Sequence, residues 1–395
     1  MPDFDIIVVG GGLGGSSFGT VMAQHGGNIL VLEQELRFRD RVRGEFLAPW
    51  GLAEVKSLGL FETFCSAGAR EIPWFELGMG PRDLTATTIQ KLPALSYSHP
   101  RIQEALIDAA KRAGAQVRRG VAVRKIEPGA KPAVECGLNG STERITARLI
   151  VAADGRNSAA RKWGGFSSQR DEHPFLLAGV LLGNVRSRED LTPVIYNPAN
   201  GYAAVAVPQG GGVFRAYMGY PAGAHKRIQG EEDLGLFLAG SEKASPMVAS
   251  TFANAKVCGP LASFDTNDSW VEHPYRDGVA LIGDAAATSD PTFGQGMSLT
   301  LRDVRVLCEE LSRGADWESA GHRYSQRHDL YFSGCHAVAN WFRHIFLEQT
   351  SVAAIQRSKA LPLIAQDPMR VPDHLFSGPD LPVNDAVKAR FFGES

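Results

Sequence analysis

The chain has 395 residues, 44% of them hydrophobic, and a formal net charge of -2 at pH 7. This length allows one large domain or two to three ordinary ones. The near-neutral charge argues against nucleic acid or an anionic membrane surface as the main partner. No run approaches the roughly 18 uninterrupted apolar residues of a membrane span. The five cysteines are scattered without a CxxC pair, so we expect no zinc site, no disulfide framework and a cytoplasmic location.

The first 33 residues predict a strand–helix–strand unit. Apolar runs over 5–9 and 29–32 predict buried strands, and residues 16–25 predict a helix ended by Gly26-Gly27. The pattern GxGxxG lies between the first strand and the helix, and an acidic residue follows the second strand. This order is typical of a unit that binds the adenosine and pyrophosphate of a dinucleotide.

Each residue type of this unit suits that task. Gly10 permits the tight turn, Gly12 lets the backbone approach a pyrophosphate, and Gly15 allows close packing of helix on strand. The helix N-terminus offers unpaired N–H groups and the positive end of its dipole. Glu33 is placed to accept hydrogen bonds from ribose hydroxyls and disfavours a 2′-phosphate, which predicts the adenosine of FAD or NAD.

Further along, the chain alternates between helical and strand patterns. Residues 40–64 are predicted to be helical and residues 84–92 to be a strand. The segment 101–114 has apolar residues at helical spacing, which predicts an amphipathic helix capped by Gly114. The stretches AQVRRGVAVRKIEP and RITARLIVAADG predict strands.

The character changes between about 175 and 220. FLLAGVLLGNV, GYAAVAVP and GGVFRAYMGYP predict antiparallel strands with one covered face. The segment PQGGGVF runs into a strand, so it predicts a hairpin turn and not a second dinucleotide fingerprint. From about 278 the pattern returns to α/β, with GVALIGDAA as a buried strand and GMSLTLRDVRVLCEEL as a helix.

Two later motifs favour FAD over NAD. In VAADGRNSAAR, Asp154-Gly155 ends a buried strand, and Gly283-Asp284 ends another. A carboxylate such as that of Asp284 can hold ribityl hydroxyls. The backbone of residues 294–298 opens a helix, and its N–H groups can face the N1/O2 edge of a flavin and stabilise the negative charge of the reduced form.

Together these motifs resemble the single-component (class A) flavoprotein monooxygenases of the 4-hydroxybenzoate hydroxylase and squalene epoxidase type. The resemblance covers roughly residues 1–345 and rests on GxGxxG at 10–15, DGxxSxxR at 154–161, and the Gly-Asp at 283–284 with the PxxGQG that follows. It implies an FAD-dependent monooxygenase. Such an enzyme uses NAD(P)H and O2, via a flavin C4a-hydroperoxide, to hydroxylate a phenolic aromatic or epoxidise an unsaturated small molecule.

The resemblance also implies which residues hold the cofactor. Arg41 or Arg43, in RVRGE, binds phosphate. The residue that covers the FAD is His99 in the hydroxylase spacing and Arg101 in the epoxidase spacing, and RxRGE leans toward the epoxidase branch. The expected cofactor-binding residues are Gly10, Gly12, Leu13, Gly14, Gly15, Glu33, Gln34, Arg41, Arg43, His99, Arg101, Val123, Asp154, Gly155, Gly283, Asp284, Gly294, Gly296, Met297 and Ser298.

On the substrate side we expect four catalytic residues. Arg215 is expected to point toward the flavin ring with Tyr217 on the same face, Tyr196 to polarise a phenol, and Pro291 to lie beside the reactive flavin edge. The alternative for the two tyrosines is that they are ordinary half-buried sheet residues. One wall of the pocket is expected to be Tyr196, Tyr202, Phe214, Tyr217 and Met218, and the other residues 291–293.

Three alternatives share the FAD site. They are an alkene reductase similar to geranylgeranyl reductase, a halogenase-like enzyme supplied with reduced flavin, and a flavin-binding protein without turnover. The W-x-W-x-I-P element of tryptophan halogenases is missing, because Trp74 stands alone. The scattered histidines follow no ligand spacing, so they are expected to be surface or packing residues and no metal is expected. The expected partners are a small organic substrate and O2, with the chain a monomer or a homodimer.

The predicted fold class is α/β with an α+β insert: a Rossmann-like FAD-binding domain with an inserted antiparallel-sheet substrate domain. The FAD-binding domain is expected over 1–72, 97–174 and 263–345. The substrate domain is expected over 73–96 and 175–262, and a C-terminal helical and loop tail over 346–395.

Overall fold

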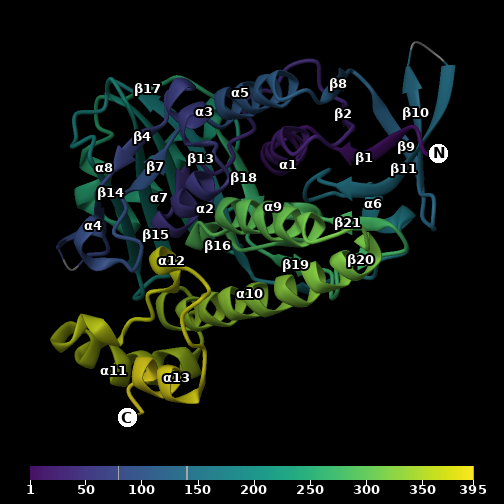
Figure 1. The fold of residues 1–395 in the computed structure, drawn as a ribbon. Coiled ribbons are helices and arrows are strands. Elements are labelled where there is room, and N and C mark those ends of the chain that lie inside the picture. The colour runs from purple at the N-terminus through teal and green to yellow at the C-terminus, as the bar shows by residue number, and fades with distance from the viewer. Residues whose placement is uncertain (79, 139–140, 395) are drawn as a thin grey trace.

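The computed structural model describes residues 1–78, 80–138 and 141–394, with one large sheet toward each end of the molecule in Figure 1. None of the helices in these residues combines the length and apolar character needed to cross a bilayer. The helices are α1 (Leu13–Gln24), α2 (Pro49–Ser57), α3 (Phe61–Ser66), α4 (Leu84–Thr87), α5 (His99–Arg112), α6 (Ala159–Trp163), α7 (Leu234–Ala244), α8 (Pro246–Ser250), α9 (Gly296–Ser312), α10 (Trp317–Phe346), α11 (Ser351–Gln366), α12 (His374–Ser377) and α13 (Asp385–Phe392), with single turns η1 (Glu231–Asp233), η2 (Gly283–Ala285), η3 (Pro291–Phe293) and η4 (Pro368–Arg370).

The first sheet has the parallel core that the apolar runs predict. Val8 lies opposite Val31 on one side and Val151 on the other, both in parallel pairing. Helices α1, α5 and α9 pack over one face, and strands and α6 cover the other, so the inner strands are buried on both sides. In spatial order the strands are β20 (Tyr275–Arg276), β21 (Val279–Leu281), β11 (Ser141–Ala152), β1 (Phe4–Val9), β2 (Ile29–Glu33) and β8 (Gln116–Arg119), with β10 (Ala133–Leu138) and β9 (Ala122–Glu127) extending from β11.

The second sheet is the antiparallel one expected between 175 and 220. The predicted hairpin is confirmed, since one strand ends at Gly210 and the next begins at Val213. Helices α7 and α8 cover one face through Ala204, Ala206 and their neighbours. The spatial order is β17 (Lys256–Val257), β13 (Phe175–Gly183), β16 (Val213–Pro221), β15 (Tyr202–Gly210), β14 (Leu191–Asn197), β5 (Trp74–Glu76) and β6 (Pro81–Asp83), with β18 (Ala262–Asp265) beside β13.

Two local predictions are wrong. The strand expected over 84–92 is α4 followed by a turn, because the Asp83 side chain accepts the backbone N–H groups of Thr85 and Ala86 and caps a helix. The helix expected over 40–64 is an irregular loop, a short strand and two helices, since Pro49 starts α2 at its first turn and Gly59 turns the chain at a φ of +69°. The remaining strands are β3 (Phe46–Leu47), β7 (Ala94–Ser96) and β4 (Arg70–Ile72) in one small sheet, and β12 (Gln169–Asp171), β19 (Asp268–Trp270) and β22 (Ala287–Thr288) in another.

The C-terminal part adds helices that the sequence patterns outlined only as mixed helix and loop. The 30-residue helix α10 packs against α9. In Figure 1, α11 and α13 lie at the lower left, away from the first sheet, whereas α12 turns back toward the body of the protein. There α12 packs against α2, so residues near the C-terminus reach the centre of the molecule.

Candidate functional site

Two adjoining cavities extend from the carboxyl ends of β1 and β2 to the second sheet. We call the one of about 420 Å3 the inner cavity and the one of about 350 Å3 the outer cavity. They share lining residues, among them Gly12, Arg43, His99 and Gly155. The two cavities are therefore parts of one elongated space that begins at the glycine turn and ends under the second sheet.

The glycine turn is packed as the motif predicts. Gly10 has a φ of +99°, and a Cβ on it would come within 2.4 Å of the Ala153 carbonyl oxygen. A Cβ on Gly15 would lie 1.9 Å from the Gly10 carbonyl oxygen, so only glycine lets α1 approach β1 this closely. Gly12 precedes the first turn of α1 and lines both cavities. The unpaired N–H groups of that turn thus face the shared space.

Glu33 binds the protein backbone as well as lining the cavity where a ribose is predicted. It lies at the outer cavity, and its two carboxylate oxygens accept the backbone N–H groups of Gly11 at 2.6 Å and Glu35 at 2.7 Å. The carboxylate therefore holds the glycine turn in place. Each oxygen has further lone pairs, which leaves capacity to accept hydroxyl groups from a ligand in the outer cavity.

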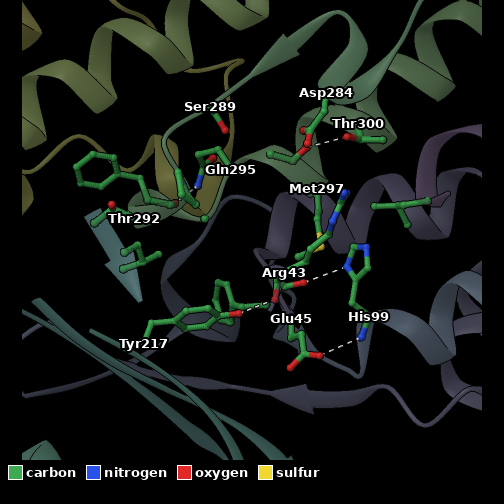
Figure 2. A pocket seen from close by; sticks show the side chains of 18 of the residues that line it. Arg43, Glu45, His99, Tyr217, Asp284, Ser289, Thr292, Gln295, Met297 and Thr300 are labelled. Atoms are coloured by element: carbon green, nitrogen blue, oxygen red, sulfur yellow. Dashed lines mark hydrogen bonds between the residues drawn. The ribbon is translucent and has the colours of Figure 1, made fainter. Parts of the chain in front are cut away.

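The two later acidic residues offer free acceptors to the same space. Asp154 lines the outer cavity, and its Oδ2 accepts the Ala160 N–H while its buried Oδ1 has no partner among the described residues. Asp284 lines the inner cavity close to the start of α9 (Figure 2). No described residue donates a hydrogen bond to its carboxylate. The preceding Gly283 is fixed by its N–H, which donates to buried Asp303 at 2.7 Å.

Buried charged residues hold the loop over residues 289–295, which precedes α9, in place. Asp290 accepts the Thr292 N–H at 2.8 Å and pairs with Arg343 at 2.9 Å, and Asp268 also pairs with Arg343. Burial raises the pKa of Asp290, and Arg343 opposes that rise. The side chain of Gln295 donates to the carbonyls of Phe293 and of Leu375 in the C-terminal segment. The loop is therefore held in one shape by partners on several elements.

Ser298 does not reach the cavity with the rest of this loop. Pro291, Gly294, Gly296 and Met297 line the inner cavity, whereas Ser298 is fully buried and absent from the described lining of both cavities. A Cβ on Gly51 would lie 2.3 Å from the Ser298 Oγ, so this side chain packs on α2. A helix shows its residues to different sides within one turn, which accounts for the difference.

The loop over residues 40–45 meets both cavities. Arg43 lines both without an ionic partner among the described residues, whereas Arg41 pairs with Glu35 at 2.5 Å. Val42 is buried with a φ of +52°, a conformation that a β-branched residue rarely adopts. Surrounding contacts must impose that shape on the chain.

Arg215, which the sequence predicts to point toward the flavin ring, supplies one of these contacts from a buried position behind the loop. Its side chain is 1% exposed and is not among the described residues that line either cavity. Its guanidinium pairs with Glu45 at 2.9 Å and Asp40 at 2.6 Å. Glu45 is buried too, and its own buried charge draws the guanidinium behind the loop instead of into the cavity.

His99, and not Arg101, lines the two cavities. The His99 Nδ1 donates to the Gly44 carbonyl at 3.1 Å, and its backbone N–H donates to Glu45 at 3.2 Å (Figure 2). Burial, helped by the Arg43 charge, lowers the pKa of His99 to about 4, so the ring is neutral at pH 7. Arg101 is exposed on α5 and lines neither cavity.

The far part of the inner cavity is an apolar chamber against the second sheet. We use the name apolar chamber for this part. Strand alternation places Val205 and Val207 toward it, because their neighbours face α7. The expected wall residues Tyr202, Phe214 and Met218 are on the opposite face, so that prediction is wrong. The chamber is lined by Phe46, Phe75, Leu77, Leu177, Thr192, Val194, Tyr196, Val205, Val207, Tyr217, Phe264, Phe293, Leu375 and Phe376.

The two predicted tyrosines lie in this chamber with their hydroxyl protons already engaged. Tyr217 donates to the Arg43 carbonyl at 2.6 Å, and Tyr196 donates to the Thr292 carbonyl at 3.1 Å. Burial raises the pKa of both phenols. Both side chains therefore remain protonated, and each ties the sheet to a loop that borders the cavity.

The residues of the combined space fit an extended dinucleotide such as FAD. Gly10, Glu33, Gln34, Val123 and Asp154, all predicted to bind the cofactor, line the outer cavity. Leu13, Gly14, Asp284 and Gly296 line the inner one, and Asp154 Oδ1 is a buried acceptor that no described residue pairs with. Sequence reasoning missed Glu45, Thr192, Leu375 and Phe376. Thr192 could have been found from the alternation of side chains along β14, because it lies on the same face as the predicted Tyr196. No local sequence pattern indicates the other three.

Comparisons with known proteins agree with this fit. The family model described as FAD binding domain matches residues 3–342. 6-Methylpretetramide 4-monooxygenase of Streptomyces rimosus is 28% identical over 327 residues, which is 78% of this chain and 76% of the relative. Rifampicin monooxygenase of Streptomyces venezuelae is 28% identical over 347 residues, or 85% and 69%. The p-nitrophenol 4-monooxygenase of Pseudomonas putida shares the fold, with a TM-score of 0.79 and 19% identity over 94% of this chain and 96% of that one.

Proposed function

Because this chain belongs to the FAD binding domain family and is an FAD-dependent monooxygenase, we propose that it uses NAD(P)H and O2 to hydroxylate an aromatic or epoxidise an unsaturated small molecule. One observation carries the proposal. The elongated space joins the glycine turn and Asp284 to the apolar chamber, with the Pro291–Phe293 turn at the junction. A cofactor held along the first part therefore meets a substrate held in the second.

The chain's own residues bind and orient in this scheme. FAD, when bound, supplies the electron transfer and oxygen activation that side chains lack. Glu33 accepts ribose hydroxyls, the first turn of α1 binds the pyrophosphate, and Asp284 accepts ribityl hydroxyls. The N–H groups at the start of α9, near Gly296 and Met297, stabilise negative charge that develops on the ring system. Arg43 supplies a positive charge where the two cavities meet.

On the substrate side the protein positions the molecule and excludes water. Since Tyr196 and Tyr217 stay protonated and donate to backbone carbonyls, neither is a base in this arrangement. The Tyr196 oxygen keeps a lone pair that can accept a hydrogen bond from a phenol, which raises the electron density of its ring. The apolar walls keep water from the reacting atoms.

The test is purification followed by a visible spectrum, and then NAD(P)H and O2 consumption against phenols and alkenes. We expect a yellow protein, substrate-stimulated consumption of both co-substrates, and a product heavier by one oxygen atom. An alkene reductase would add two hydrogens without consuming O2, and a halogenase would need halide and supplied reduced flavin. A protein that cannot be reconstituted with FAD would contradict the proposal at its base. A cytoplasmic location stays a prediction.

A further inference from the structure

One side chain of the apolar chamber is out of keeping with the rest. Thr192 on β14 is 1% exposed and lines the inner cavity. Its Oγ1 has no hydrogen-bond partner among the described residues. A buried hydroxyl without a partner costs free energy, whereas valine has the same shape without that cost. A threonine at this position therefore suits a ligand that supplies the partner.

The described chamber residues that neighbour Thr192 along β14 and on β5 are uncharged. Val194 and Tyr196 lie on the same face of β14, at alternate positions, and line the same chamber. Across the strand pair, Thr192 is in register with Phe75, whose ring centroid lies 4.5 Å from that of Phe376. The charged residues that line the inner cavity belong to the loops and turns of the cofactor part: Arg41, Arg43, Glu45, Arg156 and Asp284.

Thr192 also lies away from the expected reaction centre. Tyr196, four residues further along β14, contacts the turn before α9 through its hydrogen bond to Thr292. Four strand residues span roughly 13 Å. Within the described part of the chain, Ser289 and Thr292 also carry hydroxyls without a hydrogen-bond partner at the cavity, but they belong to the loop before α9, on the proposed cofactor side. The Thr192 hydroxyl is therefore placed to meet the end of a substrate that lies farthest from the reaction centre.

We propose that Thr192 recognises a hydroxyl or carbonyl group at the far end of an otherwise apolar, uncharged substrate, the end where Phe75 packs against Phe376. The inference rests on the proposed function, which makes the apolar chamber a substrate site. A hydroxyl side chain can donate to a carbonyl or accept from a hydroxyl. A carboxylate is a poor ligand here because its charge would lose water without gaining a cationic partner.

The test measures binding to the FAD-loaded enzyme without NAD(P)H. Naphthalene, 2-naphthol and 2-naphthoate share one skeleton, and each is titrated while the flavin absorbance is followed. We expect 2-naphthol to bind roughly three- to tenfold more tightly than naphthalene, as one net hydrogen bond gives, and 2-naphthoate to bind most weakly. Thr192→Val should diminish the preference for naphthol, because only the acceptor oxygen of Tyr196 is then left for the hydroxyl group, and Thr192→Ser should keep the full preference.

The control is Thr142→Val, the same change at an exposed strand position outside the cavities, which should leave all three affinities unaltered. An undiminished naphthol preference in Thr192→Val, tightest binding of 2-naphthoate by the wild type, or no flavin response to any probe would each overturn the proposal. Turnover is assayed separately with NAD(P)H and O2. A Thr192-dependent preference without any oxygenated product would refute the proposed function while supporting this binding role.

Discussion

Replacing Arg215 by methionine is expected to lower the free energy of unfolding by about 3–5 kcal/mol, the usual cost of removing one partner from a buried ion pair. The Arg215 side chain is 1% exposed, and its guanidinium pairs with Glu45 at 2.9 Å and Asp40 at 2.6 Å. The Asp40 side chain is 25% exposed, so water can solvate it after the change. Glu45 is 2% exposed and cannot be solvated in this way, so it carries most of the cost.

The pH dependence of this cost has a definite sign. Burial raises the pKa of Glu45 even with Arg215 beside it, and without the guanidinium that pKa rises further. A carboxyl group whose pKa is higher in the folded state is least destabilising when it is protonated. The penalty of Arg215→Met should therefore be largest at pH 8 and shrink as the pH falls toward 5. Urea unfolding at several pH values, followed by tryptophan fluorescence, measures it.

Two further variants separate the cost of the buried charge from the general cost of losing an arginine. Arg227→Met removes an exposed pair with Asp265, whose side chains are 48% and 46% exposed, and should cost at most about 1 kcal/mol. Adding Glu45→Gln to Arg215→Met should recover part of the loss, because the unpaired buried charge disappears. A penalty near that of Arg227→Met, or one that grows as the pH falls, would refute the reasoning.

Three further results are expected. Asp284→Ala should weaken FAD retention at least tenfold, measured by flavin fluorescence after gel filtration, and unchanged occupancy would refute the ribityl role. Phe376→Ala should raise KM for aromatic substrates several-fold with FAD affinity unchanged. The control Phe391→Ala, in the buried cluster of the C-terminal helices, should affect stability alone. Equal changes of KM in the two variants would argue against Phe376 as a wall of the apolar chamber. The pKa of His99 is lowered to about 4, so the folded protein keeps this ring neutral where the unfolded chain would protonate it. The resulting contribution to the free energy of unfolding, on the order of 3 kcal/mol, is fully present above pH 6.5 and is lost as the pH falls toward 4. In urea unfolding at several pH values, His99→Gln should reduce the loss of stability between pH 6.5 and pH 4.

Local rules predicted the first unit well because its constraints are local. Gly10, Gly15 and Glu33 lie within one strand–helix–strand turn, where backbone geometry and short-range contacts decide the residue type. Strand and helix periodicity likewise predicted β13, β15, β16 and α9. The strand expected over 84–92 failed because one capping side chain, Asp83, outweighed the β-branched residues after it. The prediction of the chamber wall from Tyr202, Phe214 and Met218 was wrong for another reason. The alternation of side chains along each strand is readable from the sequence, but which of the two sheet faces meets the cavity is not.

By itself the sequence determined the α/β fold class, the dinucleotide turn and the FAD-dependent monooxygenase family, since motif order and hydrophobic period do not depend on distant contacts. The tertiary structure decided the substrate side. It turned Arg215 away from the cavity toward Glu45, 170 residues earlier in the chain. It also brought Phe376, from the C-terminal segment, against Phe75. Charge pairing and packing between segments far apart in sequence act only once the chain is folded, so no local pattern records them.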